Sequence, residues 1–264
     1  MNYPSRFNRM LPVIAALVLA AWGGIEAAVV ILPNGTRVEG TDIRAQRNGD
    51  IVLTTPAGQR TFARGQYTKA IADKPAAFDQ ARALAQQGKH DEAIAMLEKI
   101  ASDYRYLDWD NNALNAIAQI QSSRGNHKEA VDAYDRLVRQ SPELRDDANF
   151  QWVYRSSLLS ASMFDKLAPI LDQLVSTGSR TDAARAQVMR GDMKLAQGQV
   201  EAGVMDYLRS AILYESEAAV QPEALLKAGQ GLEQLRDPRA KEMYRKLVAK
   251  YPASPQAQEA KSKL

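Results

Sequence analysis

Residues 125–142 have the sequence GNHKEAVDAYDRLVRQSP, and residues 88–100 have the closely similar sequence GKHDEAIAMLEKI. The two stretches share a glycine, a histidine and a Glu-Ala pair followed by a branched aliphatic residue, and they begin 37 positions apart. Recurrence at a fixed period of roughly 20–50 residues is typical of repeat proteins. The pair of stretches therefore indicates a repeat architecture.

Further copies follow at the same spacing. Taking the alanine of Glu-Ala as a marker, the equivalent positions lie 36 or 37 residues apart, at Ala93, Ala130, Leu167, Gly203 and Ala240. Four positions after each marker comes a large side chain: Leu97, Tyr134, Leu171, Tyr207 and Tyr244. Residues four positions apart share one face of an α-helix. Five copies with this internal spacing predict a solenoid of helical hairpins.

Each copy is predicted to contain two antiparallel helices. In the second copy, helix A covers residues 111–123, Gly125-Asn126 forms the turn, and helix B covers residues 128–139. Pro142 ends helix B because proline cannot donate a backbone hydrogen bond. After the fifth copy, Ser254 and Pro255 predict the N-cap and first residue of a last helix, residues 256–264, which would cap the solenoid.

The helical region resembles the tetratricopeptide repeat (TPR) family over residues 75–264. The family pattern is matched in the second copy by Ala118, Gly125, His127, Ala130, Tyr134 and Pro142, and in the fifth copy by Ala228, Ala240, Tyr244 and Pro252. The last stretch, MYRKLVAKYPASPQAQEA, is similar to repeats of bacterial envelope TPR proteins. The third copy departs from the pattern, with Arg155 and Leu167 at two small-residue positions and Ser162 in place of glycine. The period also exceeds the usual 34 residues.

The chain before the repeats has a different character. Residues 28–72 contain strand-like runs separated by Asn34-Gly35, Asn48-Gly49 and Pro56-Ala57-Gly58. Asn-Gly between such runs is a strong hairpin signal, because a type I′ turn needs positive φ at its central residues. We expect a small SH3-like β-meander or barrel of four or five strands, with a core formed by Val30, Val38, Ile43, Ile51, Leu53 and Phe62. The fold class is therefore mainly α, with this β domain preceding a TPR-like solenoid over residues 73–264.

Residues 1–27 have the pattern of a secretory signal peptide. Arg6 and Arg9 precede an uncharged run from Met10 to Ile25, and Ala27 offers a small residue before a cleavage point at Ala28. The run is shorter than the roughly 20 residues that span a bilayer, so no stable membrane span is expected after cleavage. The chain has no cysteine, which removes both disulfides and a lipoprotein anchor. We therefore expect a periplasmic or secreted protein.

Few residues are suited to catalysis or metal binding. The chain has 34 basic and 31 acidic residues, so its charge does not indicate a nucleic-acid partner. The two histidines, His90 and His127, occupy the same position in successive repeats and are expected to pack against the turn between helices. Asp110 or Asn111 is expected to be the N-cap of its helix rather than part of a calcium loop. We expect no cofactor, no metal and no enzymatic activity.

The resemblance to the TPR family implies that a ligand would lie in the concave groove formed by the A helices. In-phase positions of the five copies predict a lining rich in neutral amides, with a few aromatic and charged residues. The predicted partner-binding residues are Phe78, Arg82, Asn112, Asn115, Gln119, Asn149, Trp152, Ser156, Arg185, Asp192, Leu225 and Gly229.

These features predict an exported, non-enzymatic adaptor that binds a protein or peptide partner in the bacterial cell envelope. In one alternative, the β domain drives docking or self-association and the solenoid is a spacer. In another, the protein is a hydrolase acting on peptidoglycan, which would need a catalytic carboxylate in a cleft. The β domain itself is expected either to bind a ligand or to cap the apolar end of the first repeat.

Overall fold

The structure is a computed structural model that describes residues 28–264. The predicted signal peptide, residues 1–27, lies outside the described residues. The chain divides between Lys74 and Pro75 into two compact units, a β domain and a helical solenoid. No helix among the described residues combines the length and the apolar character needed to cross a bilayer.

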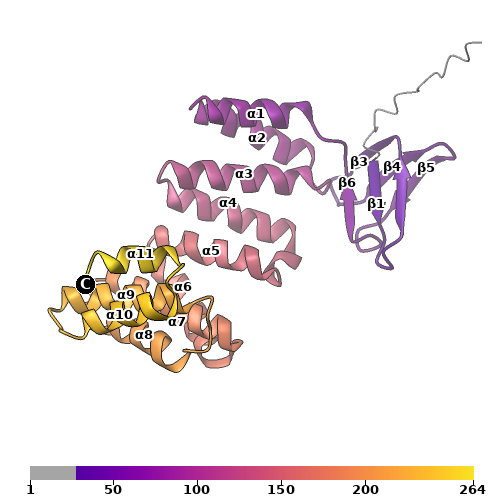
Figure 1. The fold of residues 1–264 in the computed structure, drawn as a ribbon. Coiled ribbons are helices and arrows are strands. Elements are labelled where there is room, and N and C mark those ends of the chain that lie inside the picture. Colours follow the sequence, from indigo (N-terminus) through magenta and orange to yellow (C-terminus); the bar gives the residue numbers. More distant parts are fainter. Residues whose placement is uncertain (1–27) are drawn as a thin grey trace, which may run out of the picture. The chain divides into compact units, whose positions relative to one another are not determined.

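The β domain contains six short strands in two antiparallel sheets (Figure 1). One sheet has the order β2-β1-β6 and the other has the order β3-β4-β5. The strands are β1 (Ala28–Ile31), β2 (Arg37–Gly40), β3 (Asp42–Ala45), β4 (Ile51–Thr55), β5 (Gly58–Phe62) and β6 (Lys69–Ile71). The sixth strand was not predicted, because the three residues of β6 carry no local strand signal and are held by pairing with β1.

The two Asn-Gly pairs form turns, as expected, but the turns are not of type I′. Only the glycines have positive φ, 82° at Gly35 and 89° at Gly49. The asparagines instead accept hydrogen bonds through their side chains, Asn34 from the Thr36 backbone N–H and Asn48 from that of Asp50. Such Asx turns fix the chain direction without requiring positive φ at asparagine.

The core of the β domain is formed by aliphatic side chains of both sheets. Val30, Ile51 and Leu53 are completely buried, and Ile43 and Phe62 are nearly so. Val38, which was expected in this core, is only half-buried. The chain passes from β2 to β3 at Gly40, where an added Cβ would lie 2.3 Å from the carbonyl oxygen of Thr54.

The solenoid contains five helical hairpins and a last short helix, which confirms the predicted fold class (Figure 1). The pairs are α1 (Ala76–Gln86) with α2 (His90–Asp103), α3 (Trp109–Ser123) with α4 (His127–Gln140), α5 (Ala148–Ser160) with α6 (Phe164–Thr177), α7 (Arg180–Ala196) with α8 (Val200–Leu213), and α9 (Gln221–Gln234) with α10 (Ala240–Lys250). Helix α11 (Pro255–Lys261) follows, and a 3-10 turn, η1 (Pro142–Arg145), precedes α5. Ser254 caps α11 as predicted, accepting a hydrogen bond from the Ala257 N–H.

The small residues of the repeat pattern lie where helices approach closely. A Cβ added to Gly191 on α7 would lie 2.4 Å from the ring of Tyr207 on α8, and one added to Gly229 on α9 would lie 2.4 Å from the ring of Tyr244 on α10. Each tyrosine ring therefore fills the space left by the missing side chain of the paired helix.

The expectation that Asp110 or Asn111 caps its helix is wrong. Helix α3 begins at Trp109, and its N-cap residue is Asp108, in the left-handed conformation at φ 69°. The Asp110 side chain is buried in the first turn, where its carboxylate accepts hydrogen bonds from the backbone N–H groups of Tyr106 and Asn111. Asp110 therefore stabilises the loop between α2 and α3 and does not cap the helix.

Candidate functional site

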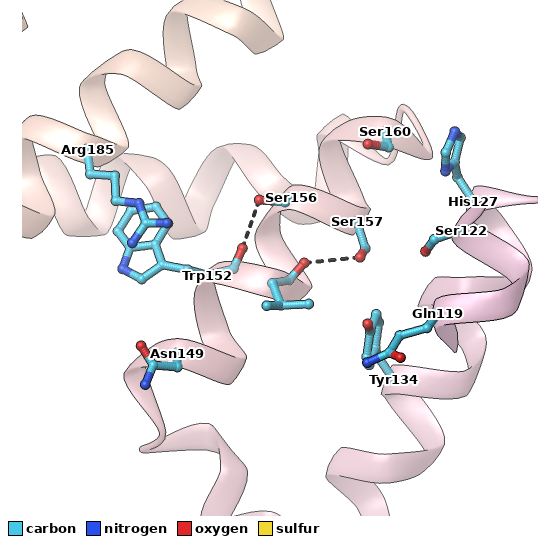
Figure 2. Close-up of a pocket in the computed structure, with 11 residues that line it drawn as sticks. Gln119, Ser122, His127, Tyr134, Asn149, Trp152, Ser156, Ser157, Ser160 and Arg185 are labelled. Atoms are coloured by element: carbon cyan, nitrogen blue, oxygen red, sulfur yellow. Dashed lines mark hydrogen bonds between the residues drawn. The ribbon is translucent and has the colours of Figure 1, made fainter. Parts of the chain in front are cut away.

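A pocket of about 590 Å³ opens beside the second and third repeats, between α3, α4, α5 and α7. This size falls within the range of roughly 300–1,000 Å³ that is typical of ligand sites. Figure 2 shows its walls, with α5 carrying most of the side chains that point into it. We call it the central pocket, and its lining residues are Gln119, Ser122, His127, Tyr134, Asn149, Trp152, Val153, Ser156, Ser157, Ser160 and Arg185.

The third repeat forms the pocket because it departs from the repeat pattern. Helix α5 carries Arg155 at the position where the other A helices have alanine or glycine, and it packs less closely against α6 than the helices of the other hairpins pack against each other. Serines on its pocket side fold back on the helix: Ser156 Oγ donates to the Trp152 carbonyl at 2.9 Å, and Ser157 Oγ to the Val153 carbonyl at 3.0 Å. These short side chains leave room for a ligand.

Trp152 is the tryptophan of the pocket lining, and two arginines lie close to its rings. Its side chain is buried, with 6% of its surface exposed. The guanidinium carbon of Arg185, on α7, lies 4.2 Å from the centre of the Trp152 rings, and that of Arg155 lies at 4.7 Å. In Figure 2 the Arg185 guanidinium lies over the indole. Both contacts have the geometry of cation–π interactions.

Three polar groups of the pocket have no hydrogen-bond partner in the described part of the chain. The side-chain amides of Gln119 and Asn149 and the hydroxyl of Tyr134 form no hydrogen bond with any residue between 28 and 264. Figure 2 shows the Gln119 amide beside the Tyr134 ring. Burial raises the pKa of the Tyr134 hydroxyl, so this group is a neutral donor at physiological pH.

The equivalent tyrosines of later repeats are already bound. Tyr207 donates to the Asp192 carboxylate at 2.7 Å, and Tyr244 donates to the Glu233 carboxylate at 3.0 Å. Lys227 also binds Asp192, at 2.7 Å. The fourth and fifth repeats thus bind the hydroxyl of this tyrosine internally, whereas the second repeat presents that of Tyr134 to the pocket.

The structure brings together five of the residues predicted to line the groove. Gln119, Asn149, Trp152, Ser156 and Arg185 all line the central pocket. The remaining predicted residues of the first two repeats do not. Arg82, Asn112 and Asn115 are exposed outside it, and Phe78 packs against Trp109 with ring centres 5.1 Å apart.

Two residues predicted from the fifth repeat do not line a groove, and a third, from the fourth repeat, is already bound by neighbouring side chains. Leu225 is completely buried in a core cluster that also contains Ala257 of α11, so it is closed to a ligand. Gly229 is buried against Tyr244, and Asp192 is bound by Tyr207 and Lys227. Leu225 could not be placed by sequence phase because its burial depends on packing between elements, including that of α11 against α9.

Sequence analysis missed six residues of the lining. Tyr134 and His127 were assigned to packing, although both also face the pocket, and Val153 carried no signal because exposed aliphatic residues are common. Ser157 and Ser160 could have been found from their position, since they lie one and four residues after the predicted Ser156 on the same helix. The six residues are Ser122, His127, Tyr134, Val153, Ser157 and Ser160.

The described residues contain no group of three or more His, Asp or Glu side chains arranged to bind a metal ion. His127 is half-buried at the start of α4. Its counterpart His90 has a buried Nδ1 with no hydrogen-bond partner among residues 28–264. The described lining of the central pocket includes no carboxylate, and its chemistry is that of hydrogen bonding, aromatic contact and positive charge.

Comparison with known proteins supports the resemblance to the TPR family. A model of the tetratricopeptide repeat matches residues 57–107 and 78–144, and a second model of this repeat matches residues 223–254. No curated protein matches the chain. The helical region has a TPR-like fold, and the matched residues cover most of its first two hairpins and its fifth, with the first match beginning in the β domain.

Several solved structures are distantly similar. A fragment of MamA from Desulfovibrio magneticus RS-1 has a TM-score of 0.45 and 18% identity, and the match covers 69% of this chain and 98% of that one. YrrB, described as a TPR protein with an unusual peptide-binding site, has a TM-score of 0.41 and 17% identity, with 70% and 90% covered. A thermophilic TPR protein from Thermus thermophilus has a TM-score of 0.38 and 16% identity, with 70% and 96% covered.

Proposed function

We propose that this protein is an exported, non-enzymatic adaptor that binds a peptide segment of a protein partner in the central pocket. The observation that carries the proposal is the set of unpartnered polar groups around one open pocket, on Gln119, Asn149 and Tyr134. A side-chain amide both donates and accepts hydrogen bonds, as does a hydroxyl. Such groups can bind the N–H and C=O groups that an extended peptide exposes.

The pocket also offers apolar surface for a partner side chain. Val153 is 48% exposed and lines the pocket together with Trp152. An aromatic ring with aliphatic neighbours is a common anchor in protein interfaces, and tryptophan is enriched among the residues that carry most of the binding energy. The amides would then set the path of the peptide backbone, while Trp152 and Val153 receive one side chain.

Binding is favoured over hydrolysis by the chemistry of the lining. Glycoside hydrolysis generally requires two carboxyl groups flanking the scissile bond. The residues that line the central pocket include no Asp and no Glu. The peptidoglycan-hydrolase alternative therefore receives no support from this pocket.

The cellular place of the adaptor is part of the proposal. The basic residues Arg6 and Arg9 followed by an uncharged run support export, and an exported adaptor without cysteines suits the bacterial cell envelope. Fractionation of cells that express the full chain checks this part. We expect a mature form that begins at Ala28, outside the cytoplasm, by N-terminal mass spectrometry.

The binding proposal is tested by photo-crosslinking in the native cell. A photoreactive amino acid is placed at position 119 or 153, inside the central pocket, or at position 132, an exposed site on α4 outside it. We expect one protein to be trapped from positions 119 and 153 and not from position 132. Equal capture from all three positions, or none from the pocket, would contradict the proposal.

A pair of variants distinguishes an effect on binding in the pocket from an effect on the stability of the fold. Ser156→Trp fills the pocket from an exposed position, and Ser123→Trp places the same side chain on an exposed position of α3 outside it. We expect Ser156→Trp to abolish the crosslink from position 119 and Ser123→Trp to preserve it, while both variants melt within about 2 °C of the parent, as is usual for surface substitutions.

A further inference from the structure

The central pocket has a strongly cationic end. We call Trp152, Arg155 and Arg185 the arginine–tryptophan cluster. Arg185 is exposed and lines the pocket, while Arg155 is half-buried and has a buried Nε without a hydrogen-bond partner in the described part of the chain. Two guanidinium groups therefore lie close to one indole, at 4.2 and 4.7 Å from its centre.

This cluster is unlike the other half-buried cations of the solenoid. Arg136 is paired with Glu98, Arg190 with Asp172 and Asp206, and Lys227 with Asp192 and Glu223. Neither Arg155 nor Arg185 forms an ion pair with any residue between 28 and 264. Burying a charge without a partner is costly, and this cost applies to Arg155, which is half-buried. Arg185 is exposed and lines the pocket, so an anion bound beside it would supply a counter-charge to the cluster.

The electrostatic surroundings point the same way. Burial lowers the pKa of Arg155, and the positive charge of Arg185 lowers it further, against an opposing effect of Asp182. The Asp182 carboxylate accepts a hydrogen bond from Ser179 Oγ at the start of α7, at 2.6 Å. Asp182 thus offsets the repulsion from Arg185, and burial is what disfavours the charge of Arg155; a further carboxylate beside the cluster would favour that charge.

Resting on the proposed function, we infer that the arginine–tryptophan cluster selects partner segments that carry an acidic side chain, Asp or Glu, for this end of the pocket. Arg185 would donate two parallel hydrogen bonds to the carboxylate from its guanidinium, which lies over the Trp152 rings. Arg155, with its guanidinium carbon 4.7 Å from the centre of the same rings, contributes further positive charge. The neutral amides of Gln119 and Asn149 hold the adjoining peptide backbone.

Selection from a random peptide library displayed on phage tests the inference. The target is the mature chain, residues 28–264, or the same chain with Arg185→Gln. We expect the peptides enriched on the parent to share an Asp or Glu at one position, and this preference to disappear on Arg185→Gln. Arg245→Gln, which removes an exposed arginine of α10, is the matched charge control and should select the same peptides as the parent.

A selected peptide is then titrated by fluorescence anisotropy. Replacing its acidic residue with the neutral amide should weaken binding to the parent by roughly ten- to hundredfold, as expected for a hydrogen bond to a charged group, and should have little effect on binding to Arg185→Gln. Arg185→Glu should reverse the preference and bind the Lys version of the peptide better than the Glu version. Amidation of the C-terminus should leave the affinity unchanged, because the carboxylate recognised is that of a side chain.

The outcomes separate this inference from the proposed function. Peptides that bind in a manner sensitive to Ser156→Trp but show no acidic preference would overturn the inference and leave the adaptor function standing. Peptides whose affinity depends on a free C-terminus, or on a phosphate group, would also overturn it. Failure to select any peptide that Ser156→Trp displaces would count against both.

Discussion

Asp206 on α8 is a completely buried carboxylate that several side chains of the fourth repeat surround. Its oxygens lie 3.0 Å from Arg190, 2.6 Å from Lys194 and 2.9 Å from Arg209, and Gln187 donates a further hydrogen bond. Burial alone would raise the pKa of Asp206, but the hydrogen bonds and positive charges of these cations hold it below its ordinary value. Arg190 also binds Asp172 of α6, so the network joins the third repeat to the fourth.

Replacing Asp206 with asparagine should destabilise the solenoid at neutral pH. We expect a loss of roughly 3 kcal/mol in the free energy of unfolding, because the three cations keep their positions without their buried partner. The pKa of Asp206 is lower in the folded state, so its stabilising effect is complete above the unfolded pKa near 3.8 and is lost as the pH falls through the folded value.

Urea denaturation at pH 7 and at several values in more acidic solution measures this effect. The difference between the parent and Asp206→Asn should be large at pH 7 and should shrink in acid. Asp132→Asn, an exposed substitution on α4, is the control and should change the free energy of unfolding by less than about 0.5 kcal/mol. A difference that stays constant with pH would show that the Asp206 charge is not what stabilises the network.

At the scale of the element, the hairpin that borders the pocket is the least firmly packed. Helices α5 and α6 have two buried residues each, whereas α7 has seven and α8 has six. Pro169 also lies inside α6, where it removes one backbone hydrogen bond. Helices with few buried apolar contacts open locally at a lower free-energy cost.

Amide hydrogen exchange should therefore be faster in α5 than in α7. We expect roughly tenfold faster exchange at the pocket-facing residues of α5, since about 1.4 kcal/mol less opening free energy corresponds to that factor. Binding of a selected peptide should slow exchange in α5 and leave α9 unchanged. Equal exchange in α5 and α7 of the free protein would contradict this difference in packing.

Element type could be predicted from the sequence because helix periodicity is a local property. The markers at Ala93, Ala130 and Ala240 all lie at or near the start of helix B of a hairpin, and the Pro142 boundary matches the end of α4 at Gln140. The strand β6 and the burial of Leu225 could not be predicted, because both depend on a partner element that lies elsewhere in the sequence.

The candidate site could be predicted only in part. Projection of one helix face found Gln119, Asn149 and Trp152, since helix phase determines which residues share a face. The projection could not show where the central pocket lies, because its position depends on how closely α5 packs against α6. The position of Arg155 next to Trp152 likewise depends on packing between helices.

At the scale of the whole molecule, the chain consists of two units, each with its own core. Within the solenoid, Ala81, Leu97 and Leu114 are completely buried among side chains of the first two repeats. In the β domain, Val30, Ile51 and Leu53 are completely buried. Each unit therefore contains the apolar interior that independent folding requires.

A fragment of residues 75–264 should fold without the β domain. We expect it to keep the helical circular dichroism of the full chain and to melt cooperatively, because its core clusters lie within the fragment. Its mass by light scattering should correspond to the same oligomeric state as that of the full chain. A lower melting temperature would support the hypothesis that the β domain caps the first repeat, and an equal one would reject it.

The divergence of the third hairpin also has an evolutionary consequence. Replacing Gly191 or Gly229 with a larger residue would displace a tyrosine ring. The serines of α5 line the open pocket instead. Mutations there can alter what is bound at small cost to folding. Binding specificity can thus change through the third repeat while the other repeats preserve the fold. Replacing that single hairpin is therefore a direct way to change what the protein binds.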